Sequence, residues 1–234
     1  MFFFLGATTL SVAQTTLNPT SNPESGVFLY NMQMNMQGQD MEFTIEREVK
    51  EEGENMVFND KTATPFGASE SITIVKKGSL LPVSMESTGF SAMKLTYGED
   101  KITGEASNMQ GNKSPIEVAK KGPVYSETII VSCLPLTEGY STSFQAFNAF
   151  VRKVVIMDLK VVGKEKIEVA GGAFDTYKVE MTSAALGDLV INNWVSLANP
   201  RMVVKSETIL PQGGKVVLEY TGMKENKKEK KAKK

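Results

Sequence analysis

The stretch Met41-Glu42-Phe43-Thr44-Ile45-Glu46-Arg47-Glu48-Val49 decides the fold, because apolar and polar residues alternate through it with a period of two. Such alternation is typical of a strand that buries one face and exposes the other. A turn-like segment, Gln37-Gly38-Gln39-Asp40, precedes it. The run before that turn, 27–37, places five large side chains on one face: Phe28, Tyr30, Met32, Met34 and Met36. Together the two runs predict a β-hairpin.

Short β-prone runs continue along the chain, separated by turn residues about every ten positions. The predicted strands are 55–62, 71–76, 81–86, 93–97, 101–106, 151–162, 166–170, 174–183, 189–197, 202–210 and 215–221. Gly163 is expected to be a break between two of them. About a dozen strands are too many for a flat sheet. The sequence therefore predicts an all-β, mainly antiparallel fold: a large meander sheet that curves into a partly closed half-barrel.

One segment favours a helix or a wide loop. Between Glu138 and Phe150, phenylalanines recur every third residue at 144, 147 and 150, and Thr142 and Ser143 are possible helix caps. At most one or two short helices are expected in the protein.

The first thirteen residues are predicted to be a signal peptide. Met1 to Leu5 is strongly apolar, and Val12-Ala13-Gln14 has the small residues of a cleavage site. The run is too short for a membrane-spanning helix, which takes about 20 apolar residues. A buried N-terminal strand is the alternative. Export to the periplasm or out of the cell is favoured, with no transmembrane segment.

The other end of the chain is basic. Lys224 to Lys234 holds seven lysines and two glutamates, which leaves a net charge of −6 between Gln14 and Met223. With almost nothing apolar to bury, 224–234 is predicted to be a disordered, solvated tail, although it can also attract an anionic membrane. Export argues against a nucleic-acid partner. One β domain is expected over 14–223.

The absence of histidine excludes several catalytic sites. Neither a Ser-His-Asp triad nor a histidine-bearing zinc site can form. Cys133 lies in the β-prone run 128–134 and is expected to be a core residue, because a nucleophilic thiol would need a base. The carboxylates of 46–54 are expected to form a solvated face rather than a catalytic pair. The sequence predicts no enzyme, no metal site and no cofactor.

Thirteen methionines leave three interpretations open. They can be ordinary core residues, the adaptable lining of a site for an apolar ligand, or thioether ligands of copper(I). The first is favoured. The single tryptophan, Trp194, is expected to pack in the core or at its rim. If an apolar ligand is bound, the predicted lining is Phe28, Tyr30, Met32, Met34, Met36 and Trp194.

Three elements of the second half carry a resemblance to a known family. They are Leu134-Pro135-Leu136-Thr137-Glu138-Gly139-Tyr140, the blocks Val162-Gly163-Lys164-Glu165 and 170–180, and Trp194-Val195-Ser196 followed by 201–205. They resemble the motifs of DUF3108, a bacterial family of exported domains of unknown function. Met202-Val203 stands where proline-valine is usual. The resemblance implies a half-barrel similar to the LolA and LolB lipoprotein carriers, which wrap an apolar concavity around lipid, and it transfers no catalytic residue.

The favoured hypothesis is a non-catalytic exported protein that binds a lipid or other apolar molecule in the concavity of its sheet. The second is a structural or protein-interaction domain of the cell envelope with no small ligand. The third, a hydrolase built on carboxylates, is the least supported. Fold analogy alone is a weak argument for any of them.

Overall fold

The computed structural model describes residues 16–36, 38–64, 67–89, 92–108, 110–187, 189–210 and 213–224. Within these ranges fifteen strands form one sheet, accompanied by one α-helix and two 3-10 helices. The strands are β1 (Gly26–Met36), β2 (Gln39–Glu52), β3 (Asn55–Thr64), β4 (Gly67–Lys76), β5 (Pro82–Ser87), β6 (Ala92–Tyr97), β7 (Lys101–Ser107), β8 (Lys113–Ala119), β9 (Val124–Tyr125), β10 (Ser141–Asn148), β11 (Lys153–Val169), β12 (Gly172–Thr182), β13 (Val190–Ser196), β14 (Val203–Ile209) and β15 (Lys215–Met223). The all-β prediction is confirmed.

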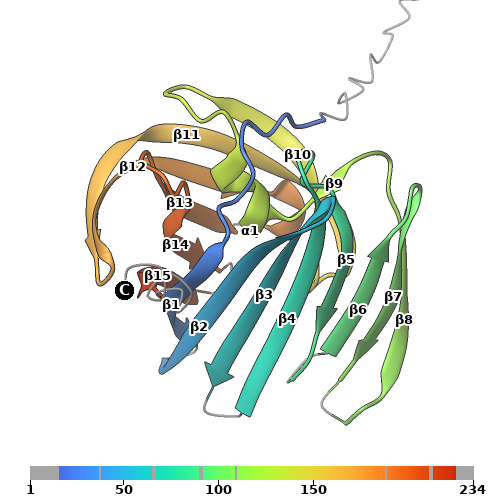
Figure 1. Cartoon of the computed structure of the whole chain (residues 1–234). Helices are drawn as coiled ribbons and strands as arrows, with labels where there is room; N and C mark the ends of the chain where they lie inside the picture. Colours follow the sequence, from blue (N-terminus) through green and yellow to red (C-terminus); the bar gives the residue numbers. More distant parts are fainter. Residues whose placement is uncertain are drawn as a thin grey trace, which may run out of the picture.

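The sheet is a meander whose first and last strands meet in its middle. The strand order is β8-β7-β6-β5-β4-β3-β2-β1-β15-β14-β13-β12-β11-β10-β9, and only the β9–β10 pair is parallel. The predicted first hairpin is confirmed, since β1 and β2 pair from Gly26 opposite Val49 to Met36 opposite Gln39. Figure 1 shows how the sheet curls so that its two halves face each other. This is the predicted half-barrel.

The two edges of the sheet approach each other without a backbone ladder. Apolar residues of β6, β7 and β8 form a second core with Val124, Phe147 and Val154 from the other edge. Arg152 Nη1 also donates a hydrogen bond to Ser114 Oγ across the seam, at 2.8 Å. Pro115 in β8 cannot donate to a further strand, which protects this edge from pairing with another chain. The sheet therefore stays open at the seam, and side chains bridge its two edges.

A short helical segment fills part of the concave side. It consists of α1 (Glu127–Ile130) and the 3-10 helix η1 (Val131–Cys133), and Figure 1 shows α1 inside the curl of the sheet. The β-prone run 128–134 therefore does not form a strand. Its side chains from Ile129 onward are buried, with Ile130 1%, Val131 0% and Leu134 0% exposed. Burial on all sides overrides the β-propensity of the run.

Two further local predictions are corrected. The segment expected as a helix or loop, 138–150, contains β10, because pairing with β11 buries Phe144 and Ala146 against the core. Gly163 does not end a strand. It lies at a register shift inside β11, where a β-bulge lets one long strand continue from Lys153 to Val169. A strand that was not predicted, β8, follows the turn at Gly111.

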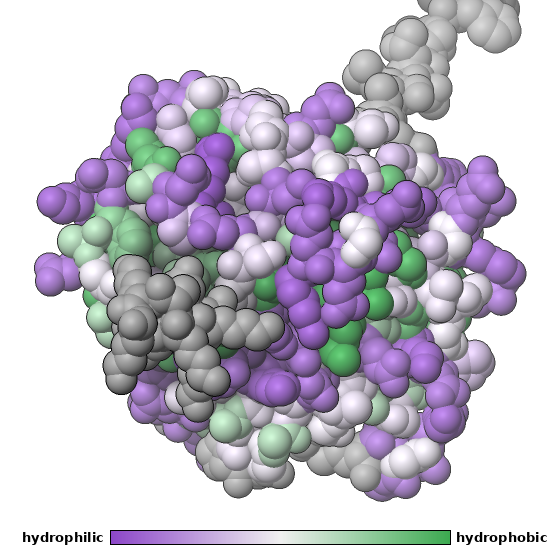
Figure 2. Space-filling model, viewed as in Figure 1, coloured by the Kyte–Doolittle hydropathy of each residue, from purple (hydrophilic) through white to green (hydrophobic). Residues whose placement is uncertain are grey.

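The main core lies between the concave face of the sheet and the α1–η1 segment. Cys133 is part of it, 1% exposed and unpaired, as predicted. On the face shown in Figure 2, apolar side chains occur in small groups between polar ones. No helix in the described ranges is long and apolar enough to cross a bilayer. The predicted signal peptide, 1–13, and the predicted tail beyond Lys224 lie outside the described residues.

Candidate functional site

A small cavity lies between the sheet and α1. Its volume is about 40 Å³, the space of one or two water molecules. One wall comes from β1, β2 and β3, the opposite wall from α1 and η1, and the rim from two loops. The lining residues are Pro23, Glu24, Phe28, Tyr30, Arg47, Val49, Phe58, Thr128, Ile129, Ser132, Pro200, Arg201, Met202 and Val203.

The sheet wall of the cavity is mostly apolar because strand alternation brings one face of β1–β3 inward. Phe28 is 4% and Phe58 5% exposed. Tyr30 is buried beside Tyr220 of β15, with ring centroids 5.8 Å apart in an edge-to-face arrangement. Burial raises the pKa of Tyr30 to about 12, although the nearby Arg47 opposes the rise. The phenol is therefore neutral at physiological pH.

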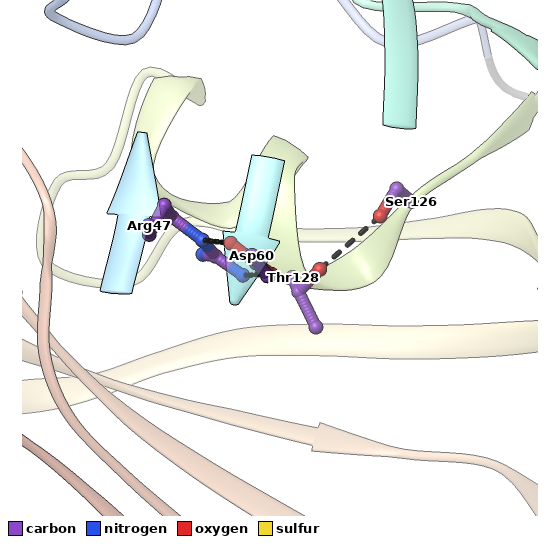
Figure 3. Close-up of polar contacts among 4 residues, drawn as sticks. All are labelled: Arg47, Asp60, Ser126 and Thr128. Carbon is purple, nitrogen blue, oxygen red and sulfur yellow. Dashed lines mark hydrogen bonds and ion pairs between the residues drawn. The ribbon is translucent and has the colours of Figure 1, made fainter. Parts of the chain in front are cut away.

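An ion pair interrupts this apolar wall. Arg47 Nε and Nη2 donate to Asp60 Oδ1 and Oδ2 at 2.7 and 2.6 Å, a bidentate pair between β2 and β3. The two side chains are 21% and 24% exposed. Burial alone would lower the pKa of the Arg47 guanidinium, but the contact with Asp60 outweighs it and the pKa is raised. Figure 3 shows the pair next to α1, where Thr128 faces the same cavity.

Arg201, at the rim, has an unused donor. Its Nε is buried and has no hydrogen-bond partner among the described residues. Arg201 also acts on Cys133, whose thiol pKa is raised by burial and lowered less strongly by Ser132 and Arg201. The thiol therefore stays protonated, as expected for a core cysteine. A ligand oxygen placed at the rim would satisfy the Arg201 donor.

The helical wall is held against the sheet by apolar contacts. In the described ranges no hydrogen bond joins α1 to a strand; the side-chain bond at its N-terminus is local, between Ser126 Oγ just before α1 and Thr128 Oγ1, at 3.2 Å (Figure 3). Hydrogen bonds to the N-terminal stretch lie near the two ends of the segment: Leu17 N donates to Tyr125 Oη just before α1, and Thr20 N donates to the Cys133 carbonyl. The segment is thus tethered at both ends and packed hydrophobically between them.

Of the six predicted lining residues, some line the cavity and others lie elsewhere on the sheet. Phe28 and Tyr30 line the cavity. Met32 and Met34 are half-buried farther along β1, beside Leu218 and Val216 of β15, and neither lines it. Met36 ends β1, and its side chain lies outside the described part.

Trp194 lies on the other face of the sheet. Its neighbour Val195 belongs to the main core, so alternation directs the indole outward. There it is covered by Lys178 and Lys205, whose Nζ atoms lie 5.2 and 5.7 Å from its ring centroid. Its Nε1 donates to Glu165 Oε2 at 2.8 Å, and this hydrogen bond is the main reason that the pKa of Glu165 is lowered. The packing role predicted for Trp194 fits these contacts.

Sequence reasoning missed the polar members of the cavity. Arg47 and Asp60 carried a detectable signal: Arg47 is in phase with Phe43 and Ile45 on the buried face of β2, where a charge is unusual. No comparable pattern in the sequence marks Arg201 or Thr128, because both lie in segments that connect strands and the sequence pattern does not predict the path of those segments.

The first residue of α1 provides a pH-dependent test. Burial raises the pKa of Glu127 above its ordinary value of 4.5, so the folded state disfavours the carboxylate. Its contribution to stability is full below the ordinary value and is lost as the pH rises through the raised one. Glu127→Gln should therefore raise the free energy of unfolding at pH 7 and give a smaller gain at pH 4.

Urea denaturation at both pH values measures this effect. Glu138→Gln, at a side chain that is 67% exposed, is the matched control and should change stability little at either pH. A gain for Glu127→Gln that is equal at pH 4 and pH 7 would contradict the assignment to charge burial.

The chemistry of the cavity suits binding. Tyr30 is held protonated, and Arg47 is committed to Asp60. Among the residues that the structure describes, no three cysteine, aspartate or glutamate side chains gather as a metal site would require. An apolar wall with a donor at its rim can hold an apolar chain that has a polar end.

One comparison with a solved structure agrees with the fold. A β-barrel-like protein of the DUF1849 family from Brucella abortus is similar with a TM-score of 0.57 and 8% identity, over 88% of this chain and 99% of that one. A Bacteroides fragilis protein with a YmcC-like fold has a TM-score of 0.41 and 12% identity, over 89% and 100%. No curated protein matches. The model of the family described as "Protein of unknown function (DUF3108)" matches residues 29–221, so the chain belongs to DUF3108.

Proposed function

We propose that this protein is a non-catalytic, exported binding protein that holds an apolar chain, such as the acyl chain of a lipid, between its curved sheet and α1. The observation that carries the proposal is the cavity itself. Its sheet wall is formed by Phe28, Tyr30, Val49 and Phe58, and its opposite wall is a helix attached by apolar contacts. The predicted signal peptide supports export to the periplasm or beyond.

The cavity must widen to admit such a chain, and the energies allow it. Moving α1 exposes chiefly Ile129 and Ile130, which costs about 1.5–3 kcal/mol for each side chain. A bound chain gains about 0.8 kcal/mol for each methylene that it buries, so ten methylenes give about 8 kcal/mol. Because hydrophobic contacts are not directional, the ligand can replace those that α1 gives up. The tethers at Tyr125 and Cys133 would limit the movement.

Binding of a fluorescent fatty acid to the purified protein tests this proposal, together with native mass spectrometry for co-purified lipid. Thr128→Trp places an indole over the cavity from an exposed position on α1 and should weaken binding about tenfold or more, because the chain loses its space. Thr96→Trp, exposed on β6, is the matched control and should bind as the wild type does.

Absence of lipid in the native spectrum together with no fatty-acid binding by the wild type would reject the ligand proposal. A second function would then be favoured, that of an envelope domain that contacts a protein partner. One observation supports this alternative: Val131, Cys133 and Leu134 pack the concave side at 0–1% exposure beyond the cavity. Proximity labelling that recovers one envelope protein is its test.

A further inference from the structure

The loop between β10 and β11 presents an uncovered aromatic side chain. Phe150 is 97% exposed, and the adjacent Val151 is 45% exposed. Seven large apolar side chains are exposed in the described ranges, and Phe150 and Val151 are the only two of these that are adjacent in the sequence. Apolar side chains gathered in this way mark a contact surface more often than isolated ones do.

The backbone holds this loop in an outward position. The Asn148 side-chain oxygen accepts hydrogen bonds from the backbone N–H groups of Phe150 and Val151, both at 3.1 Å. On the other side of the turn, Arg152 is hydrogen-bonded to Ser114 of β8. Phe150 is therefore presented to solvent by a turn that is fixed on both sides, and a partner that buries the ring need not reorganise the loop.

The charges around Phe150 indicate which surface it meets. The loop continues directly into Arg152 and Lys153, both exposed, and 148–153 contains no acidic residue. The nearby Lys113 is paired with Glu105 and adds no net charge. An aromatic ring flanked by cations fits an anionic bilayer, where the ring enters the interfacial region and the cations lie near the phosphates.

We propose that the β10–β11 loop docks the protein on an anionic phospholipid surface, with Phe150 inserted among the lipids. The contact is small, so binding is weak and reversible. It does not depend on a ligand in the cavity, and protein without ligand suffices to test it. The lysine-rich sequence 224–234 also attracts anionic lipid, so the decisive comparison is between variants of equal charge.

Co-sedimentation of the full chain with phosphatidylglycerol-containing vesicles makes that comparison. Phe150→Ser should weaken binding about tenfold or more, because the ring supplies most of the apolar contact. Ile209→Ser removes an exposed apolar side chain from β14, 43% exposed, and should leave binding unchanged. Pure phosphatidylcholine vesicles should bind the wild type less, since they carry no net charge for Arg152 and Lys153 to meet.

Insertion is tested separately with Phe150→Trp and brominated lipids. Quenching of the new tryptophan, above the background from Trp194, is the expected result, since Trp194 is 8% exposed and covered by lysines. Equal vesicle binding by Phe150→Ser and the wild type would overturn the proposal, as would an unquenched Trp at 150. If the wild type self-associated but did not bind vesicles, and Phe150→Ser abolished the self-association, a second copy of the chain would cover the loop instead.

Discussion

Replacing Ile130 with alanine is expected to lower the free energy of unfolding by about 2–5 kcal/mol. Ile130 is the last residue of α1 and is 1% exposed within the main core. The truncation removes apolar contacts and leaves a cavity that the surrounding β-sheet cannot readily fill, because its strands are fixed by their ladders. Urea denaturation measures the loss.

Ile156→Ala provides the matched control, with the same atoms deleted at a side chain that is 44% exposed on β11. This substitution should lower the free energy of unfolding by less than about 1 kcal/mol, because folding removes less apolar surface from water at Ile156 than at Ile130. If Ile130→Ala cost no more than Ile156→Ala, α1 would not be an integral part of the core. In that case the helix would be a loosely attached cover, and the energy needed to open the cavity would be smaller than argued above.

The sequence predicted the secondary structure correctly where one face of a strand packs on the core and the other faces water. The alternation from Met41 to Val49 predicted β2 and its pairing with β1, and both are observed. Prediction failed where both faces of a segment are buried. The run 128–134 has the composition of a strand, yet it enters the concave side as α1 and η1, where the surrounding sheet decides its conformation.

The candidate site was predictable to the same extent. Phe28 and Tyr30 were found because they share the buried face of β1, and Met32 and Met34 share that face but lie beyond the end of the cavity. Periodicity states which face a residue occupies, but not what lies opposite it. The wall formed by α1 and the rim near Arg201 come from segments between strands, whose paths no local pattern records.

The ion pair in the cavity wall gives a second large effect. Arg47→Met should lower the free energy of unfolding by about 2–3 kcal/mol, because it leaves the Asp60 carboxylate in a mostly apolar wall without its partner. This value is below the usual cost for a fully buried pair, since the two side chains are 21% and 24% exposed and water reaches them. Lys101→Met is the control: it breaks an exposed pair with Glu117 and should cost about 0.5 kcal/mol or less.

The double variant Arg47→Met, Asp60→Leu completes the cycle. Removing both charges leaves no unpaired group, so the double variant should lie within about 1 kcal/mol of the wild type, far from the sum of the single losses. Single and double losses that simply add would show that the pair is not coupled. The same variants bear on function: if the cavity binds through its apolar wall, the double variant will keep its affinity for fatty acid, because Phe28, Tyr30 and Phe58 remain in place. Loss of that affinity in a stable double variant would assign Arg47 to the ligand rather than to the fold.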